Sequence, residues 1–253
     1  MEAILSYSLH DKVCQWSVGS IVVLIFNSLE EMNTSRGTKM TESHIVYNKF
    51  KWAIKSGDKD QLIAASDSTL LSAKKKLKGL ILIARYNKPE LISTMIARGC
   101  LINKDYKNGK TPLQVAAQYG SLAVLNALLN EGESLIFFHF KIILQKIGAE
   151  VDLKNGSGQT ALHIASKEGR LDVVKTLTRN GASILAADAK GNTPFHLAVS
   201  KRQDEVLDYF LNINCNCLEV KNNAAQTALH LSILYENTHA LIALCLRGEI
   251  IRK

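Results

Sequence analysis

The sequence lacks the features that would place it in several large protein classes. Its five cysteines are an odd, scattered set among 253 residues, which argues against a secreted disulfide framework and favours a reducing compartment. No stretch reaches the roughly 18 to 20 apolar residues that a membrane-spanning helix needs. Residues 1–15 carry a lysine and an aspartate, and no small-residue cleavage site follows them, so we expect no signal peptide. These absences favour the cytoplasm, the nucleus or both.

Aromatic residues and catalytic signatures are also scarce. Phe, Trp and Tyr make up 6% of the chain, while Leu, Ile and Ala are abundant, which suits a stack of helices. The sequence contains no nucleophile elbow, glycine-rich phosphate loop or H-E-x-x-H motif. We therefore expect neither an enzyme nor a bound cofactor.

The charge is mildly basic, with a net value of +8 and a pI of about 9.2. Such a balance favours acidic partners without indicating nucleic acid. The one local basic run is K-K-K-L-K at residues 74–78. It reads either as a solvated helix end, which we favour, or as a nuclear-import or acidic-partner site.

Internal repetition is the dominant pattern. Residues 191–198 read G-N-T-P-F-H-L-A, and close copies stand at residues 158–165, 225–232 and 109–116. Thr160 and Thr193 are 33 residues apart, Thr193 and Thr227 are 34 apart, and Thr111 lies one period plus 16 residues before Thr160. A period near 33 with a T-P-L-H core is the signature of ankyrin repeats. From about Asn48 to its last residue, the chain therefore resembles the ankyrin-repeat family.

The resemblance implies an all-α repeat solenoid of stacked helix-turn-helix units joined by short β-hairpin loops, L-shaped and with a concave groove. We expect a poorly structured N-terminal extension at 1–44, followed by an ankyrin-repeat domain at 45–253. The first two repeats are divergent. The six predicted repeats are 48–77, 78–104, 105–153, 154–186, 187–220 and 221–253.

Two segments do not fit the repeat. Residues 1–39 are interpreted as disordered or as foreign to the working protein, while the rival interpretation makes Ser20–Leu29 a short helix that covers the first repeat or touches a membrane. Residues 132–147 form a Phe-rich insertion in the third repeat. The insertion either extends the second helix and presents an apolar docking surface or is an artefact of splicing or gene prediction, which we favour.

The position of a residue within its repeat predicts its structural role. The threonines of the motif are predicted helix N-caps, and Leu113, Leu162, Phe195 and Leu229 begin the predicted buried stripe of each first helix. Second helices should bury pairs such as Val173-Val174 and Leu241-Ile242. Gly120 and Gly169 should end first helices in the left-handed conformation, where Arg202 and Glu236 would cost roughly 1 kcal/mol each.

The histidines and cysteines resemble metal ligands by residue type alone. His163, His196 and His230 occupy one place in successive repeats, and in ankyrin-like repeats that histidine bonds backbone groups of adjoining turns. Cys100, Cys215, Cys217 and Cys245 fall where the repeat has small or apolar residues, so we interpret them as buried hydrophobes and expect no metal site.

The last repeat ends on an apolar helix, whereas a terminal repeat needs a polar outer face. We expect either further repeats or a partner that covers this end.

The function that the resemblance implies is a protein-protein interaction scaffold or adaptor whose partner docks across the groove. The alternative is the regulatory or targeting arm of a larger enzyme or ubiquitin-ligase subunit whose C-terminal part is missing. We expect a protein partner with some acidic surface, and neither nucleic acid, membrane nor small molecule. The candidate binding residues at hairpin tips and first-helix ends are Tyr106, Lys107, Asn108, Lys110, Gln118, Tyr119, Lys154, Asn155, Ser157, Gln159, Lys167, Glu168, Lys190, Asn192, Ser200, Lys201, Asn222, Asn223, Gln226, Leu234 and Tyr235.

Overall fold

The computed structural model describes residues 42–69, 71–105, 109–134, 148–213 and 217–251. Most of the predicted N-terminal extension lies outside these residues, as do Tyr106, Lys107, Asn108 and residues 135–147 of the predicted insertion. Contacts divide the chain into residues 1–45 and residues 46–253, and the second unit carries the features that follow.

The described residues form helices that come in pairs, and no strand occurs among them. This agrees with the predicted all-α repeat fold. The pairs are α3 (Glu42–Ser56) with α4 (Lys59–Ser66), α5 (Ala73–Tyr86) with η1 (Pro89–Leu91) and α6 (Ile92–Ala97), α7 (Pro112–Tyr119) with α8 (Leu122–Ser134), α9 (Ala161–Lys167) with α10 (Leu171–Arg179), α11 (Pro194–Ser200) with α12 (Asp204–Asn212), and α13 (Ala228–Leu234) with α14 (Thr238–Ile251).

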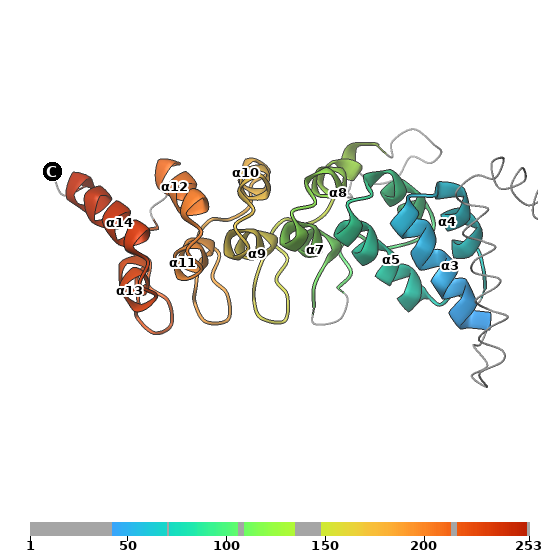
Figure 1. Cartoon of the computed structure of the whole chain (residues 1–253), viewed down its shortest axis with the longest axis horizontal. Coiled ribbons are helices and arrows are strands. Elements are labelled where there is room, and N and C mark those ends of the chain that lie inside the picture. Colours follow the sequence, from blue (N-terminus) through green and yellow to red (C-terminus); the bar gives the residue numbers. More distant parts are fainter. Residues whose placement is uncertain (1–41, 70, 106–108, 135–147, 214–216, 252–253) are drawn as a thin grey trace, which may run out of the picture. The chain divides into compact units, whose positions relative to one another are not determined.

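The first helices of successive repeats lie side by side, from α5 through α7, α9 and α11 to α13, and α8, α10, α12 and α14 make a second row (Figure 1). Within these two rows, adjacent helices contact each other, and each first helix contacts the second helix of its own repeat. The fully buried Leu162 and Phe195 of the first row and Val174 and Leu207 of the second belong to one continuous core. One repeat could not bury this apolar stripe alone, so stacking is the source of stability.

The ends of the first helices follow the sequence prediction. Thr111, Thr160, Thr193 and Thr227 each precede a first helix in extended backbone and form a capping box with the residue three positions on. Gly120 and Gly169 have φ of 71° and 67°, and Arg202 and Glu236 take the same left-handed place with φ of 56° and 51°. Arg202 and Glu236 therefore have the left-handed backbone for which a cost of roughly 1 kcal/mol each was predicted.

The third repeat closes normally around the predicted insertion. Its second helix, α8, runs to Ser134, so the first three residues of the insertion are helical. The N–H of Ala149 donates to the carbonyl of Leu128 at 3.0 Å, just as the N–H of Ala182 donates to Leu177 at 3.0 Å in the next repeat. The chain thus returns to the ordinary repeat register after the extra residues.

Burial predictions failed in the last repeat. Leu229 is 38% exposed and Ile242 is 61% exposed, although the sequence pattern placed both on the buried stripe. Cys245 was also predicted to be buried and is exposed. In the interior repeats the equivalent first-helix leucine is covered by the following repeat, and no such neighbour lies against α13 and α14 among the described residues.

The other described cysteines are buried, as predicted. Cys100 is a buried free thiol whose pKa is raised by desolvation. Cys217 is fully buried, but its sulfur takes part in a disulfide rather than remaining a thiol.

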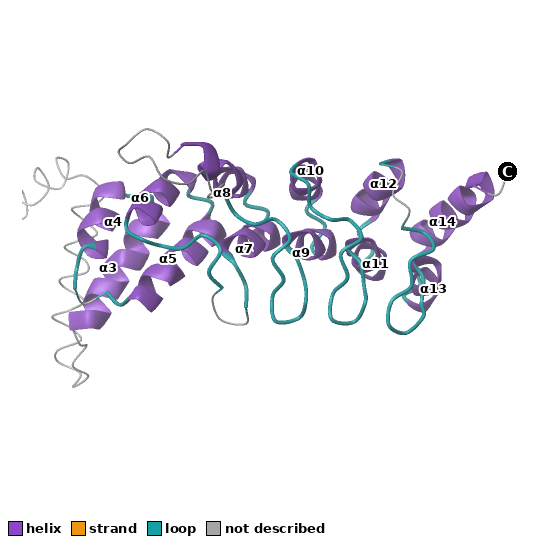
Figure 2. Ribbon diagram, turned by 180° about the vertical axis from the view of Figure 1, so that it is seen from behind, coloured by secondary structure: helices purple, strands orange, loops and turns teal. Residues whose placement is uncertain are grey.

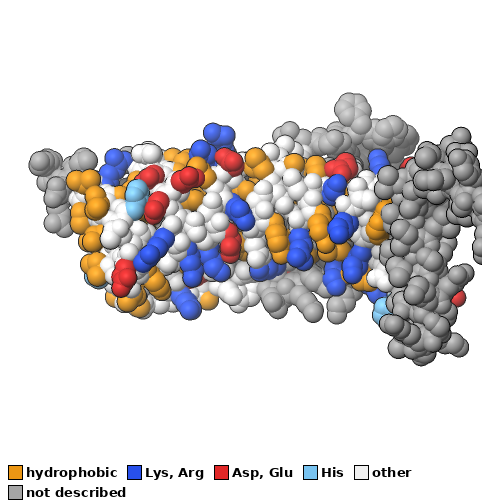
Figure 3. Space-filling model, in the orientation of Figure 1, with side chains coloured by type: hydrophobic (Ala, Val, Ile, Leu, Met, Phe, Trp, Pro, Cys, Tyr) orange, Lys and Arg blue, Asp and Glu red, His pale blue; other side chains and the backbone are white. Residues whose placement is uncertain are grey.

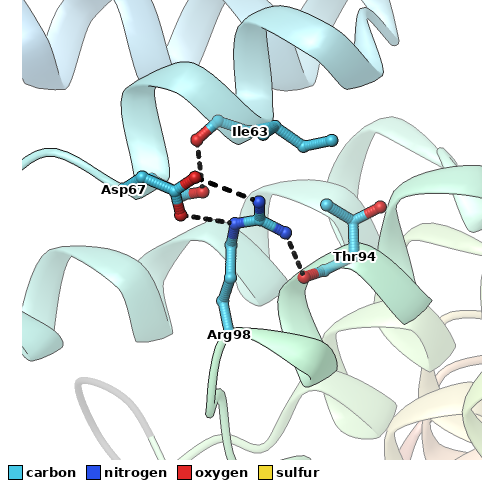
Figure 4. Close-up of polar contacts among 5 residues, drawn as sticks. Ile63, Asp67, Thr94 and Arg98 are labelled. Atoms are coloured by element: carbon cyan, nitrogen blue, oxygen red, sulfur yellow. Dashed lines mark hydrogen bonds and ion pairs between the residues drawn. The ribbon is translucent and has the colours of Figure 1, made fainter.

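An ion pair joins the two divergent repeats. Asp67, which follows α4, accepts two bonds from Arg98 at the end of α6, with Nε to Oδ1 at 2.9 Å and Nη2 to Oδ2 at 3.2 Å (Figure 4). The Asp67 backbone N–H also donates to the Ile63 carbonyl at 3.1 Å, and Arg98 Nη1 donates to the Thr94 carbonyl at 3.4 Å. The two helix ends are therefore held together by a bidentate contact.

Replacing Asp67 with asparagine is expected to cost less than about 1 kcal/mol, because the Asp67 side chain is 59% exposed and exposed pairs contribute little. Denaturant unfolding at low salt should show this small loss, and about 1 M NaCl should remove the difference from wild type by screening. A loss of several kcal/mol, or one that salt leaves unchanged, would contradict a purely electrostatic contribution.

Candidate functional site: the hairpin tips and first-helix ends

Buried histidines connect each repeat to the next. His163 Nε2 lies 3.0 Å from the carbonyl of Asn192, and His196 Nε2 lies 3.1 Å from the carbonyl of Val220. In the third repeat, Gln114 Nε2 donates to the carbonyls of Leu153 and Gln159 at 2.7 and 3.1 Å. The predicted structural role of His163 and His196 is confirmed, and the same contact holds the base of the following hairpin in place.

The hydrogen bonds fix the tautomer of these rings. The backbone N–H of Thr160 points to His163 Nδ1 at 3.2 Å, and that of Thr193 points to His196 Nδ1 at 3.2 Å. Since a backbone N–H can only donate, Nδ1 accepts and the proton lies on Nε2, facing the carbonyl of Asn192 for His163 and of Val220 for His196. Burial lowers the pKa of both imidazoles, against a smaller opposing effect of the backbone carbonyls that they contact.

The hairpin tips before α9, α11 and α13 are each closed by an Asn or Asp side chain at their start. Asn155 Oδ1 accepts from the N–H groups of Ser157 and Gln159 at 2.9 and 3.0 Å. Asp188 and Asn222 repeat this arrangement in the next two hairpins. Two backbone bonds also close each of these hairpins. In the first, the Asn155 N–H donates to the Gln159 carbonyl at 2.9 Å and the Gly158 N–H donates to the Asn155 carbonyl at 2.8 Å. Asn155 and Asn222, two of the candidate binding residues, thus shape the tips.

Successive tips also bond to each other. The N–H of Ala189 donates to the Ser157 carbonyl at 3.1 Å, and the N–H of Asn223 donates to the Lys190 carbonyl at 3.0 Å. The loops before α9, α11 and α13 lie side by side and project past the helices (Figure 2). The tips therefore form a continuous row with fixed spacing.

The described candidate residues are all open to solvent to some degree. Those that are exposed are Tyr119, Lys154, Ser157, Lys190, Lys201, Asn223, Leu234 and Tyr235. Those half-buried are Lys110, Gln118, Asn155, Gln159, Lys167, Glu168, Asn192, Ser200, Asn222 and Gln226.

Some of the candidate lysines are already engaged within the stack. Lys154 Nζ donates to the carbonyl of Ala187 at 2.8 Å, and Lys110 Nζ donates to Gln118 Oε1 at 2.9 Å. Lys167 lies 3.8 Å from Glu168. The exposed Lys190 and Lys201 are therefore better placed to meet a partner than the engaged Lys154.

Two further residues of this surface, Arg85 and Tyr86 at the end of α5, were not predicted from the sequence. Tyr86 ends α5 in the position that Tyr119 and Tyr235 take in their own repeats, and it is 40% exposed. The Arg85 guanidinium stacks over the Tyr119 ring at 5.3 Å from the centroid, so α5 and α7 share an exposed aromatic and cationic cluster. The signal that could have found them was the period itself, since Tyr86 lies 33 residues before Tyr119.

Lys and Arg side chains predominate over the row of first helices in the face of the molecule shown in Figure 3. No group of three or more potential metal ligands occurs among the residues that the structure describes. In the same residues, no helix is long and apolar enough to cross a membrane. The arrangement offers a polar, mainly basic row with aromatic side chains, which suits contact with another macromolecule.

Comparison with protein families gives a match over most of the repeat region. The family model described as "Ankyrin repeats (3 copies)" matches residues 50–138 and again residues 136–220.

Similar curated proteins share this region at modest identity. The B-cell lymphoma 3 protein homolog of Mus musculus is 32% identical over 161 residues, which cover 62% of this chain and 32% of the relative. Inversin of Canis lupus familiaris is 28% identical over 152 residues, covering 60% of this chain and 13% of the relative. The NF-kappa-B inhibitor cactus of Drosophila yakuba is 28% identical over 68 residues, covering 26% of this chain and 14% of the relative. The chain thus spans about a third or less of the length of the relatives it matches.

Proposed function

We propose that this chain, which belongs to the ankyrin-repeat family, is a scaffold or adaptor that binds a partner protein across its hairpin tips and first-helix ends. Repeats of this family are protein-protein interaction modules. We propose a binding surface, the chemical character of the partner, and a location in the cytoplasm or nucleus. It assigns the chain no catalytic role.

One observation carries the choice of surface. The last positions of the first helices share one repeat register, and none of them is buried. They hold a tyrosine in three repeats and a charged residue in the other two: Tyr86, Tyr119, Glu168, Lys201 and Tyr235. The buried positions of the same helices, by contrast, keep the same kind of side chain in the third to fifth repeats, such as Ala116, Ala165 and Ala198. A row of exposed side chains that has a fixed spacing, but does not hold the same residue in every repeat, is suited to recognising one particular partner surface.

The chemistry of the row favours a partner with acidic groups. Lys190 at the hairpin tip and Lys201 at the end of α11 are both exposed in the fifth repeat, and Arg85 lies beside two exposed tyrosines. Tyr and Arg are the residues that most often dominate binding energy in interfaces, and complementary charge speeds association. The net charge of +8 acts in the same direction.

The test begins with affinity purification on the full chain and identification of the bound protein, followed by measurement of its dissociation constant. The double variant Lys190→Glu and Lys201→Glu is expected to weaken binding at least about tenfold at low salt, with a smaller effect at high salt. Tyr119→Ala should weaken it by a similar factor, because exposed tyrosines supply contact area at small entropic cost.

Arg179→Glu is the matched control, since Arg179 is an exposed cation at the end of α10, in the second row of helices. It should leave affinity unchanged. Binding that survives the Lys190 and Lys201 reversals and Tyr119→Ala, but is lost in Arg179→Glu, would move the interface to the other side and refute the proposal.

A further inference from the structure

The basic run at residues 74–78 lies in a helix. α5 begins at Ala73 and has 14 residues, whereas the first helices α7, α9, α11 and α13 have seven or eight. One period separates Lys78 from Thr111, so the start of α5 takes the sequence positions that later repeats give to their hairpin tips. In the second repeat, a helix end with four lysines therefore stands in the place of a hairpin tip.

Two of these lysines meet a third lysine from the first repeat at one aromatic ring. The lysine cluster consists of Lys51 of α3 and of Lys75 and Lys78 of α5. Their Nζ atoms each lie 5.4 Å from the centroid of the Tyr47 ring. Tyr47 itself stacks on the fully buried Phe50, with ring centroids 6.4 Å apart. The three ammonium groups therefore converge on a ring that the core of the first repeat holds in place.

The charges of this cluster repel one another. A ring has two faces, so at least two of the three ammonium groups lie over the same face, where one cation would already satisfy the ring. The first turn of α5 holds no acidic residue, although the N-terminal end of a helix favours anions over cations. Residues 42–105 contain twelve Lys and Arg and six Asp and Glu, so the first two repeats supply +6 of the net charge of +8.

The hydroxyl of Tyr47 is an independent indication of a ligand. Its oxygen is buried and has no hydrogen-bond partner among the residues that the structure describes. Buried hydroxyl groups in native proteins nearly always have a partner, and an unpaired one indicates a place where an acceptor fits. A tyrosine hydroxyl donates one hydrogen bond. The same ring thus offers a donor to an anion that the surrounding ammonium groups attract.

We propose that the lysine cluster and the Tyr47 hydroxyl bind a phosphate group carried by a segment of the partner protein. This inference rests on the proposed function, since it adds a site in the register of the hairpin tips. A phosphate monoester brings a charge of about −1.5 to −2 and three acceptor oxygens, which match three converging ammonium groups. A carboxylate has one charge and two oxygens, so it would neutralise less of the cluster. Partner binding therefore depends on phosphorylation of the partner.

Nitrogen-15 NMR of the full chain tests the site directly with a five-residue peptide that holds one phosphoserine between glycines. The peptide should shift the amide signals of α3 and of the start of α5 in a saturable manner. Its dissociation constant should be at least about tenfold lower than that of the same peptide with unmodified serine, because the added charge and oxygens are what the cluster recognises. Inorganic phosphate should shift the same signals.

The triple variant Lys51→Gln, Lys75→Gln and Lys78→Gln should weaken binding of the phosphopeptide at least about tenfold. Tyr47→Phe should weaken it about threefold, since the ring and its packing remain but the donor is lost. Circular dichroism checks that both variants keep their helix content.

The triple variant Lys49→Gln, Lys55→Gln and Lys59→Gln is the matched control, because it removes the same charge from exposed lysines of α3 and α4 outside the cluster. It should change the dissociation constant less than about twofold. Equal weakening in the two triple variants would show attraction by net charge alone and would overturn the proposal. Equal affinity for the phosphorylated and unmodified peptides, or tighter binding of vesicles that contain anionic phospholipid, would overturn it as well.

The partner protein separates this inference from the proposed function. Removal of its phosphate groups by a phosphatase should weaken its binding to the wild-type chain at least about tenfold and should have little effect on its binding to the cluster variant. Binding that depends on Lys190 and Lys201 but not on the lysine cluster would overturn this inference and leave the proposed function in place.

Discussion

Replacing Gly158 with alanine is expected to destabilise the protein by about 2–5 kcal/mol, measured by urea unfolding followed by circular dichroism. Gly158 has φ of +72°, where a Cβ costs about 1–2 kcal/mol. The added methyl would also lie 2.6 Å from the backbone N of Ala189 and 3.1 Å from the backbone carbon of Asp188. Both are main-chain atoms of the next hairpin, so relief requires the hairpin itself to move, which adds a further cost of about 1–3 kcal/mol from overpacking.

Two matched substitutions separate the conformational cost from the steric cost. Gly181 has φ of +83°, and a methyl group added there would meet no atom within 4 Å, so Gly181→Ala should cost only the conformational part, about 1 kcal/mol. Ala225→Gly should stabilise by about the same amount, because it removes the left-handed strain at φ of 57°. If Gly158→Ala and Gly181→Ala cost the same, successive hairpins are not in the close contact described.

Lowering the pH from about 7.5 to about 5 is expected to destabilise the stack through His163 and His196. Burial lowers the pKa of both imidazoles in the folded chain, so the unfolded chain binds protons more readily below its ordinary histidine value of about 6.5. The stability that depends on the neutral rings is complete above that pH and is lost as the pH falls towards the folded pKa values. By about pH 5 the loss reaches at most about 2 kcal/mol for each ring.

The structural reason is that a second proton has no acceptor. Nδ1 of each ring already faces a threonine N–H at 3.2 Å, so protonation there would break the capping box. Asp188 opposes the loss at both rings by favouring the charged form, while Lys154 adds to it at His163. The exposed His239 acts in the other direction, since its bond to Asp208 raises its pKa and contributes stability that is lost as the pH rises.

The double variant His163→Gln and His196→Gln provides the control, because Gln114 makes the equivalent bonds in the third repeat without a titrating group. Its urea midpoint should change much less between these two pH values than that of wild type. An acid loss that persists undiminished in the double variant would assign the pH dependence to other groups.

The repeat motif alone predicted the fold because its residues act locally. The threonine caps, the left-handed glycines and the histidine contacts each depend on two or three neighbouring turns, and these recur at a fixed period. The first helix of the third repeat, α7 (Pro112–Tyr119), begins directly after the predicted cap Thr111 and ends directly before the predicted left-handed Gly120. These features could be predicted from the sequence without knowing how many repeats the stack contains.

Burial in the last repeat could not be predicted from the sequence in the same way. Leu229, Ile242 and Cys245 have the residue types of buried positions, but burial depends on a neighbouring repeat and not on the residue itself. The left-handed backbone of Ala225 was not predicted, because alanine rarely adopts it. It becomes apparent only when Ala225 is aligned with Gly158 and Gly191, which take the same place in their hairpins.

The binding surface was predicted in outline but not in detail. Tyr86 and Arg85 were overlooked because the second repeat has lost the T-P-L-H signature that aligns the others. Lys154 was predicted as a free tip residue, yet its ammonium bonds a carbonyl of the next repeat. Such contacts depend on which side chain can reach across a layer, which repeat spacing does not specify.

The contact of each histidine with the following repeat is the most direct consequence of stacking, and nitrogen-15 NMR of the imidazole rings measures it. We expect His163 and His196 to carry their proton on Nε2, these protons to exchange slowly, and the rings to show nuclear Overhauser effects to Thr193 and Lys221. Rings protonated on Nδ1, or without these contacts, would show that the histidines do not join successive repeats.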